Sequence, residues 1–212
     1  GSPVGYIFTP HVGIMGFEEA MLALVDKPDL MRYLIEKVSD IHPEWAKTYA
    51  EAGCHAFIIS ESEFSSDLIS PDTYKRILFD IHKRYFREVS KMGMIPILCF
   101  FGNINPLIKH INKIGIKALM VEESRKGFKI DILKIRESLN EEITLFGNID
   151  PHQVLVKGTP QDVEKAVKKQ LLAARRGRFI VSNGSPLITG TPVENVKAMI
   201  KTTRQYGKNP YW

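Results

Sequence analysis

The sequence lacks several features that would assign it to a large class of proteins. It has only two cysteines, Cys54 and Cys99, which argues against a disulfide scaffold and is typical of a reducing cytoplasm. No run of about 18 apolar residues occurs, so we expect no membrane span. The first residues do not combine a basic segment with a long apolar one, so we expect no signal peptide and a cytoplasmic location. Low-complexity stretches are absent too, and 44% of the residues are hydrophobic, which excludes disorder.

Charge of one sign is also scarce. The chain of 212 residues has 29 Lys+Arg and 24 Asp+Glu, a formal net charge of +5. Its one dense basic stretch is 175–178 (Arg-Arg-Gly-Arg), which we interpret as the solvated end of a helix, where cations are favourable. The alternative is a nucleic-acid patch. The balance of charges predicts no nucleic-acid partner.

What the sequence does contain is a series of short apolar runs, each of the length of a buried strand. Near-continuous apolar runs of this kind are typical of parallel strands that are covered on both faces. The predicted strands are Val4–Phe8, Ala56–Ser60, Ile95–Phe101, Ala118–Val121, Ile143–Phe146 and Phe179–Ser182.

Amphipathic helical stretches separate these strands. They run over 28–52, 71–92, 106–114, 129–139, 160–176 and 192–206. Several begin with a capping residue before a proline, a pattern that starts helices: Ser70-Pro71, Asn105-Pro106, Asp150-Pro151, Thr159-Pro160 and Thr191-Pro192, the last also as a capping box.

The alternation of strand and helix predicts an α/β fold with a parallel sheet. An open doubly wound sheet and a (β/α)8 barrel both satisfy it. The chain has no Gly-x-Gly-x-x-Gly after its first strand and no Walker A loop, which favours the barrel. We predict a (β/α)8 TIM-barrel type with about six βα units, as a single domain over 1–212.

In a barrel, chemistry occurs where strands end, and polar residues follow each predicted strand. The segments at these ends are Thr9–His11, Glu61–Glu63, Cys99–Asn103, Glu122–Ser124, Gly147–Asp150 and Ser182–Ser185. From them we predict a ligand-binding rim, with Tyr6, His11, Ser62, Asn148, Asn183 and Ser185 as substrate-binding residues.

Two kinds of chemistry are compatible with this rim. A metal site would use Cys99, with His11 and carboxylates such as Glu61 and Glu122 converging on it. The alternative is that Cys99 is a small buried apolar residue, since no paired Cys or His spacing supports a metal. The other histidines in helices (His42, His82 and His110) are expected at the surface.

Acid–base catalysis is the second possibility. Glu61 and Asp150 follow different strands, and clustered carboxylates raise one another's pKa and serve as acid and base. We predict both as catalytic, while Asp150 has the alternative role of capping its own helix. No histidine lies near Ser62, Ser182 or Ser185 in sequence, so a serine hydrolase is not expected.

Two blocks of the sequence resemble the uroporphyrinogen decarboxylase superfamily: 145–151 (Leu-Phe-Gly-Asn-Ile-Asp-Pro) with Gly158–Val163, and 182–186 (Ser-Asn-Gly-Ser-Pro) with Thr191–Val196. The segment 63–71 is similar to the cobalamin-linked methyltransferase branch. The resemblance runs from about Gly5 to Tyr206.

The resemblance implies a (β/α)8 barrel and one of two chemistries. The decarboxylases remove carboxylates of uroporphyrinogen without metal or cofactor. The methyltransferases move methyl groups between a corrinoid protein and a thiol or other acceptor, and use zinc to form a thiolate. The resemblance therefore implies a tetrapyrrole or corrinoid ligand, a corrinoid carried by a partner protein, and zinc. A third possibility is a non-catalytic ligand- or partner-binding barrel.

The sequence departs from the family pattern at the metal-binding positions. Where the methyltransferases have His-x-Cys-Gly, this chain has 99–102 (Cys-Phe-Phe-Gly), so Phe101 replaces a cysteine ligand. Ser185 stands near a further expected cysteine, and also where the decarboxylases have a histidine. Ser62 matches the position of a serine that contacts substrate in the decarboxylases.

The resemblance also implies that the first two βα units of the family barrel are missing, because Val4–Phe8 resembles the family's third strand. Six strands would leave apolar edges unpaired. We therefore expect a homo-oligomer, or a fragment of a longer enzyme.

Overall fold

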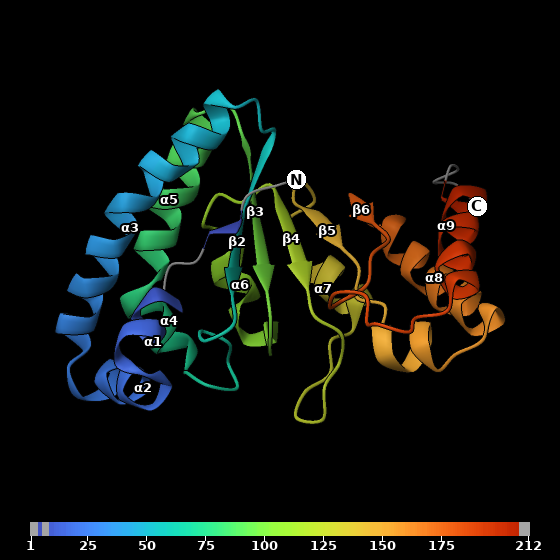
Figure 1. The fold of residues 1–212 in the computed structure, drawn as a ribbon, viewed down its shortest axis with the longest axis horizontal. Helices are drawn as coiled ribbons and strands as arrows, with labels where there is room; N and C mark the ends of the chain where they lie inside the picture. The colour runs from blue at the N-terminus through green and yellow to red at the C-terminus, as the bar shows by residue number, and fades with distance from the viewer. Residues whose placement is uncertain (1–3, 6–8, 208–212) are drawn as a thin grey trace. The chain divides into compact units, whose positions relative to one another are not determined.

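The structure is a computed structural model that describes residues 4–5 and 9–207 (Figure 1). Side chains are described from residue 12 onward, with the exception of residue 42. The chain forms two compact units, Gly1–Ala118 and Leu119–Trp212. No helix of the described residues is long and apolar enough to cross a membrane.

The first unit contains three parallel strands that pair in chain order. Val4 lies opposite Ile58, and the register of the next pair runs from Ala56 opposite Ile95 to Glu61 opposite Phe100. Its elements are β1 (Val4–Gly5), α1 (Thr9–Met15), α2 (Phe17–Asp26), α3 (Pro28–Glu51), β2 (Ala56–Glu61), α4 (Pro71–Ile77), α5 (Phe79–Lys91), β3 (Ile95–Phe100), a 3-10 turn (Asn105–Leu107) and α6 (Ile108–Ile111).

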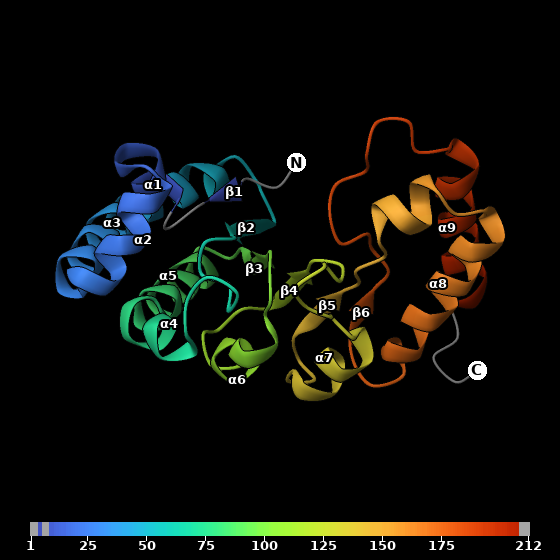
Figure 2. The same cartoon turned by 90° about the horizontal axis from the view of Figure 1, so that it is seen from below.

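Helices α3 and α5 lie side by side in this unit, and Figure 2 shows α4, α5 and α6 along one side of β2 and β3. Arg84 of α5 donates to Ser39 and to Asp40 of α3, at 2.9 and 3.0 Å. The core beneath them is apolar and fully buried, with Met31, Ile35, Phe57, Ile59, Phe86 and Leu98. Burial of these side chains is the main force that holds the helices on the strands.

Two of the helix predictions in the first unit are wrong in detail. The segment expected to follow the first strand as a loop, including Thr9–His11, forms α1, and α2 follows it. Gly16 separates the two helices at φ +86°, a conformation that favours glycine. The helix expected over 71–92 breaks at Leu78, whose φ of −106° departs from the helical range.

The second unit contains β4 (Ala118–Val121), α7 (Ile132–Ser138), β5 (Thr144–Phe146), a π-helical turn (Pro151–Val156), α8 (Pro160–Ala174), β6 (Phe179–Ile180) and α9 (Val193–Tyr206). Strands β5 and β6 are parallel, with Leu145 opposite Phe179, and a bridge between Ile149 and Asn183 extends the pairing. Helices α8 and α9 pack on one another, and both views show them side by side (Figures 1 and 2).

In the second unit, the buried Arg136 links the end of α7 to the starts of β5 and β6. The guanidinium of Arg136 donates to the backbone carbonyls of Ile143, Arg178 and Leu139, at 2.6, 3.1 and 2.8 Å, and to Asn140. Only 1% of the residue is exposed, and burial lowers the pKa of its guanidinium while the charge of Glu141 opposes that shift. The carbonyls after α7 and before β5 and β6 are thereby satisfied by one cation.

Helix starts follow the predicted caps at three of five positions. Ser70, Asp150 and Thr159 each accept from backbone N–H groups, and Thr159 forms a capping box with Asp162. The cap predicted at Thr191 is wrong, because its hydroxyl donates to Ile188 O and α9 starts at Val193. The cap predicted at Asn105 is wrong too: this residue lies inside the 3-10 turn.

Candidate functional site at the carboxyl ends of the strands

Two carboxylates and one arginine form a network just after β4 in the second unit. Arg125 donates to Glu122 at 2.6 Å and lies 2.9 Å from a carboxylate oxygen of Glu123. Ser185, from the loop after β6, donates to Glu123 at 2.8 Å and accepts from Arg125 at 3.1 Å. Glu122 and Glu123 are 8% and 5% exposed, whereas half of the Arg125 side chain is exposed. The arginine offsets the repulsion between two nearly buried carboxylates.

The loop after β6 can approach these carboxylates because residue 184 is glycine. A Cβ there would lie 2.3 Å from the backbone nitrogen of Glu123 and 2.5 Å from its Oε2. Asn183, one residue earlier, donates to Ser185 O at 2.6 Å and so closes the loop. The predicted binding residues Asn183 and Ser185 are thus brought together with Glu123.

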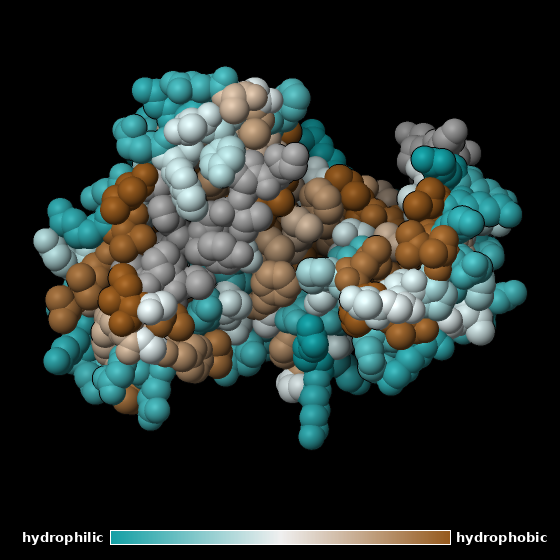
Figure 3. All heavy atoms as spheres, in the orientation of Figure 1, coloured by the Kyte–Doolittle hydropathy of each residue, from teal (hydrophilic) through white to brown (hydrophobic). Residues whose placement is uncertain are grey.

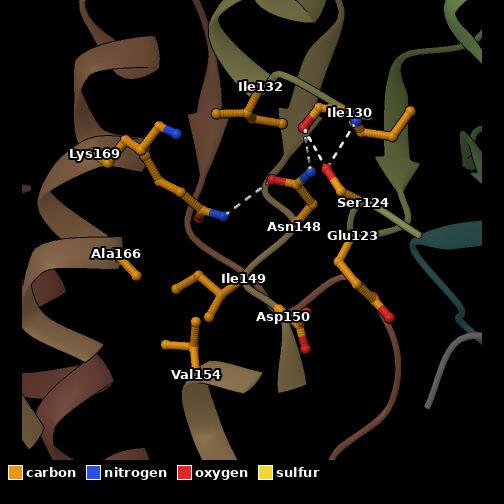
Figure 4. Close-up of a pocket in the computed structure, with 11 residues that line it drawn as sticks. Glu123, Ser124, Ile130, Ile132, Asn148, Ile149, Asp150, Val154, Ala166 and Lys169 are labelled. Atoms are coloured by element: carbon orange, nitrogen blue, oxygen red, sulfur yellow. Dashed lines mark hydrogen bonds between the residues drawn. The ribbon is translucent and has the colours of Figure 1, made fainter. Parts of the chain in front are cut away.

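Asn148, which follows β5, connects that strand to the loop after β4. Its amide donates to the carbonyls of Glu122 and Ile130 at 3.2 and 3.3 Å, and Figure 4 shows Asn148 and Ser124 both directed at Ile130. With its amide oxygen assigned from its hydrogen-bond partners, Gln170 of α8 accepts from the backbone N–H groups of Asn148 and Ile149 at 2.7 and 2.8 Å. Asn148 therefore both shapes the site and is half-buried in it.

A cavity of about 270 Å³ lies beside Asn148, and Figure 4 shows its lining. Its polar groups come from Glu123, Ser124, Asn148, Asp150, Lys169 and Gln170, and its apolar wall from Ile130, Ile132, Ile149, Val154 and Ala166. Both signs of charge and an apolar wall meet here, which is typical of a site for a small polar ligand.

Asp150 caps its helix, one of the two roles that its sequence context left open, and also borders the cavity. It lines the cavity, and its Oδ1 accepts from the backbone N–H groups of His152 and Gln153, both at 2.8 Å. The cap holds one carboxylate oxygen in place. Because the Asp150 side chain is only half-buried, its carboxylate is oriented by the cap and still exposed to solvent.

In the first unit, Glu61 ends β2 and is fully buried. Its Oε1 lies 3.4 Å from Nε2 of His82, whose Nδ1 lies 2.9 Å from the hydroxyl of Tyr74. His82 is 0% exposed, so its predicted surface placement is wrong: position 82 faces the inner side of α5. Burial, and secondly the charge of Glu61, raise the pKa of Tyr74 far above its ordinary value.

The loops after β2 and β3 are joined by Asp67. It accepts from the backbone N–H of Asn103 at 2.8 Å, and Gly102 beside it adopts φ +90°. A Cβ on Gly102 would lie 2.4 Å from Cβ of Ser65, so glycine is required for this close approach. Ser62, the predicted binding residue, is exposed at the start of the first loop.

Cys99 lies in β3 in register with Ser60, and its side chain is half-buried. The other thiol, Cys54, precedes β2. From Ala56, the first residue of this strand, to Ser60 the strand rises roughly 13 Å at ~3.3 Å per residue, so the two thiols cannot bind one metal. Among the described side chains, no group of three His, Cys, Asp or Glu residues is placed to hold a metal ion. The described residues around Cys99 do not fit zinc.

Tyr6 lies outside the described residues, and His11 lies in α1 with no description of its side chain. Sequence reasoning missed Arg125, Tyr74 and Gln170. None of them directly follows a strand in a recognisable motif. One sequence signal could have indicated the contact between Tyr74 and His82. Both are polar residues at core-facing positions of consecutive helices, eight residues apart.

The fold is that of an α/β protein of the barrel type, and the candidate site lies at the carboxyl ends of its strands. The family model described as uroporphyrinogen decarboxylase (URO-D) matches residues 4–206. The chain belongs to this family.

Relatives in both branches of the family are similar to the chain. The methylcobamide:CoM methyltransferase MtaA of Methanosarcina barkeri is 30% identical over 93% of this chain and 59% of its own length. MtbA of Methanosarcina mazei is 27% identical over 84% of this chain and 50% of its own length. A uroporphyrinogen decarboxylase of Chlorobaculum tepidum is 28% identical over 75% of this chain and 43% of its own length. The chain spans about half the length of the curated relatives it matches.

A solved structure, a methyltransferase from Methanosarcina mazei, matches 97% of this chain and 59% of its own chain at a TM-score of 0.82 and 24% identity. This likeness confirms the predicted α/β fold class of the barrel type. The described residues contain six strands, fewer than the eight of a complete barrel.

Proposed function

We propose that this chain is a methyltransferase, or part of one, that acts with a corrinoid carried by a partner protein. The observation that carries the proposal is the 30% identity to a methylcobamide:CoM methyltransferase over 93% of the chain. The strand-end site lies within the matched residues, and its cavity joins charged groups to an apolar wall. Such a lining suits a small polar acceptor.

The residue roles are those that the sequence predicts. We assign Glu61 and Asp150 to proton transfer, because each has a carboxylate oriented by hydrogen bonds at a strand end. Contacts to the ligand are assigned to the predicted binding residues: Tyr6, His11, Ser62, Asn148, Asn183 and Ser185. Since the residues around Cys99 do not fit zinc, no step is routed through that metal.

The test is methyl transfer from methylcobalamin to 2-mercaptoethanesulfonate, followed by the change in corrinoid absorbance and by mass spectrometry of the thioether. Asp150→Asn keeps a good capping residue and removes the carboxylate, so we expect about 100-fold slower turnover. The matched control is Asp131→Asn, at the cap of α7, which accepts from Leu133 N and should leave turnover unchanged. Equal rates in both variants, or no turnover of the unaltered protein, would refute the proposal.

Uroporphyrinogen decarboxylation is the second candidate, favoured by 28% identity to the Chlorobaculum tepidum enzyme. Incubation with uroporphyrinogen and analysis of the carboxylates on the product decide it. A non-catalytic binding barrel is the third candidate, and it is favoured by Phe101 and Ser185 at positions where the family has metal ligands. Corrinoid binding in the absence of either turnover would support this third reading.

We further propose that residues 1–212 act as a single domain, that the protein works in the cytoplasm, and that it is a homo-oligomer. Self-association is supported by large apolar side chains that are exposed on α2 and α3 of the first unit: Leu22, Val25, Leu30, Tyr33, Ile41 and Trp45. Figure 3 shows brown, hydrophobic surface in the part of the molecule where α2 and α3 lie. Contiguous exposed apolar surface marks interaction sites. Light scattering that gives the mass of one chain would exclude the oligomer.

A further inference from the structure

We infer that His82 and Tyr74 are positioning residues that fix the orientation of the Glu61 carboxylate. The inference rests on the proposed function, in which Glu61 transfers a proton at the strand-end site. It adds two residues that follow no strand and belong to none of the motifs above. Together the three side chains form the Glu61 relay.

The Glu61 relay is built from three elements and shut away from water. Glu61 ends β2, Tyr74 lies in α4 and His82 in α5, and each of the three is 0% exposed. The hydroxyl of Tyr74 is 2.9 Å from Nδ1 of His82, and Nε2 is 3.4 Å from Oε1 of Glu61. A buried carboxylate is retained only with hydrogen-bond donors nearby, and the imidazole is one for Glu61.

The donors and acceptors in the relay allow two proton arrangements. An ionised Glu61 only accepts, so Nε2 of His82 must hold a hydrogen and Nδ1 is left to accept from Tyr74. When the imidazole gains a second proton, Nδ1 becomes a donor as well. The tyrosine hydroxyl then accepts instead of donating, since it can do both.

This adaptability is the physical reason for a tyrosine at position 74. A phenylalanine would fill the same space and offer no partner to Nδ1 in either arrangement. A proton that Glu61 takes up stays on its carboxyl group, because Nε2 of His82 already holds a hydrogen. Oε1 continues to accept from Nε2, and the Tyr74 hydroxyl continues to donate to Nδ1.

The surroundings of the Glu61 relay are mainly aromatic. The ring of Phe86 lies 5.7 Å from the ring of His82, and that of His110 lies 6.0 Å from the ring of Tyr74. His110, on α6, is the one other titratable side chain among the ring contacts that the structure describes for Tyr74 and His82. Aromatic packing keeps the imidazole plane fixed.

The orienting role requires that the hydrogen of the neutral imidazole lies on Nε2, toward Glu61. The first test is therefore nitrogen-15 NMR of the His82 side chain in the full chain, assigned by loss of its signals in His82→Gln. We expect a hydrogen on Nε2 in all molecules. Tyr74→Phe should leave the hydrogen on Nε2, because Glu61 still accepts it, and should move the Nδ1 signal toward that of an imidazole nitrogen with no hydrogen-bond donor. Tyr33→Phe, at an exposed position of α3, should change neither.

A neutral ring with its hydrogen on Nδ1, or an equal mixture of tautomers in the unaltered protein, overturns the inference. So does an unchanged Nδ1 signal in Tyr74→Phe. This measurement needs no turnover, so it decides the inference even if the proposed methyl transfer fails.

The second test compares His82→Leu and His82→Gln in the methyl-transfer assay. Leucine removes the donor to Glu61, and we expect kcat to fall about 100-fold with KM within about threefold. Glutamine supplies an amide N–H near the position of Nε2, so kcat should recover to within about tenfold of the unaltered protein. If His82→Leu does not fold, His82→Gln and Tyr74→Phe carry the comparison.

Equal kcat values for the leucine variant and the unaltered protein overturn the inference. Equal losses in the leucine and glutamine variants, with both folded, also overturn it, because the loss would then reflect packing. If the unaltered protein transfers no methyl group, the proposed function is wrong. The NMR measurement alone then decides whether His82 and Tyr74 orient Glu61.

Discussion

The two units of this protein each hold carboxylates at a strand end, and they stabilise them in opposite ways. In the first unit Glu61 is sealed with His82 and Tyr74, all 0% exposed. In the second, Glu122 and Glu123 are compensated by Arg125, half of whose side chain is in water. The first network cannot exchange its partners without opening the core, whereas the second can take up water or a ligand in place of the arginine.

The difference teaches how burial decides the strength of a polar contact. In a low-dielectric interior, loss of one partner leaves the other uncompensated and costs several kcal/mol. At a half-exposed site, water replaces the missing partner and the loss is small. The expected effects of substitution therefore separate the two networks.

The largest effect is expected for His82→Leu, which leaves the buried carboxylate of Glu61 without its imidazole donor. We expect the free energy of unfolding to fall by about 3–5 kcal/mol. Tyr74→Phe should cost about 1–3 kcal/mol, and the double variant less than the sum. Urea unfolding in a Trp212→Phe background, where Trp45 of the first unit is the remaining tryptophan, measures these losses.

The control for this prediction is Tyr33→Phe, which should change the free energy of unfolding by less than about 0.5 kcal/mol. If His82→Leu lowers the free energy of unfolding by less than about 1 kcal/mol, the Glu61 network is not closed to water. The two units would then not differ in how they stabilise their carboxylates.

A smaller effect is expected for Gly184→Ala in the second unit. Its Cβ would lie 2.3 Å from Glu123 N, so the loop after β6 must move away and lose the contact between Ser185 and Glu123. We expect destabilisation of about 1–3 kcal/mol, measured by amide exchange at Asn148 and Ile149. The matched control is Gly127→Ala, where a Cβ meets nothing within 4 Å. Equal exchange in the two variants would contradict the close approach.

A still smaller effect is expected for Arg125→Ala. Water can reach the vacated position beside Glu122 and Glu123, so the loss should be about 1 kcal/mol and should shrink in 1 M salt. Amide exchange in the second unit at low and high salt measures it. A loss as large as that of His82→Leu would mean that exposure does not distinguish the two networks.

The smallest effect concerns Asp67, an exposed carboxylate in the same unit as the sealed network. Burial raises the pKa of Asp67, but the hydrogen bonds from Asn103 N–H and Ser65 outweigh it, so the net pKa is lowered. A pKa lower in the folded than in the unfolded chain contributes stability above the unfolded value of about 3.9, which is lost as pH falls through the folded value.

We therefore expect Asp67→Asn to be less stable than the unaltered protein by under about 1 kcal/mol at pH 7, and the two to converge below about pH 3. Urea unfolding at several pH values checks this. A gap that widens as the pH falls would contradict the sign of the shift. Agreement would show that exposure, rather than membership of a unit, sets the strength of each carboxylate's contacts.

Much of the fold followed from local chemistry. Continuous apolar runs predicted the starts of all six described strands to within one residue, for example that of Ala118–Val121, because a strand buried on both faces must be apolar throughout. Ser70, Asp150 and Thr159 marked helix starts, because their side chains satisfy free N–H groups a few residues away.

The sequence by itself determined the α/β alternation, the strand-end residues and the family, since these depend on neighbours along the chain and on recurrent motifs. Only the tertiary structure decided that His82 is buried against Glu61, that Arg125 compensates Glu122 and Glu123, and that Arg136 holds four carbonyls. These contacts join side chains to groups on other turns, strands or loops. Periodicity reports which side of a helix is apolar, but a polar residue on that side becomes meaningful only when folding brings its partner to it.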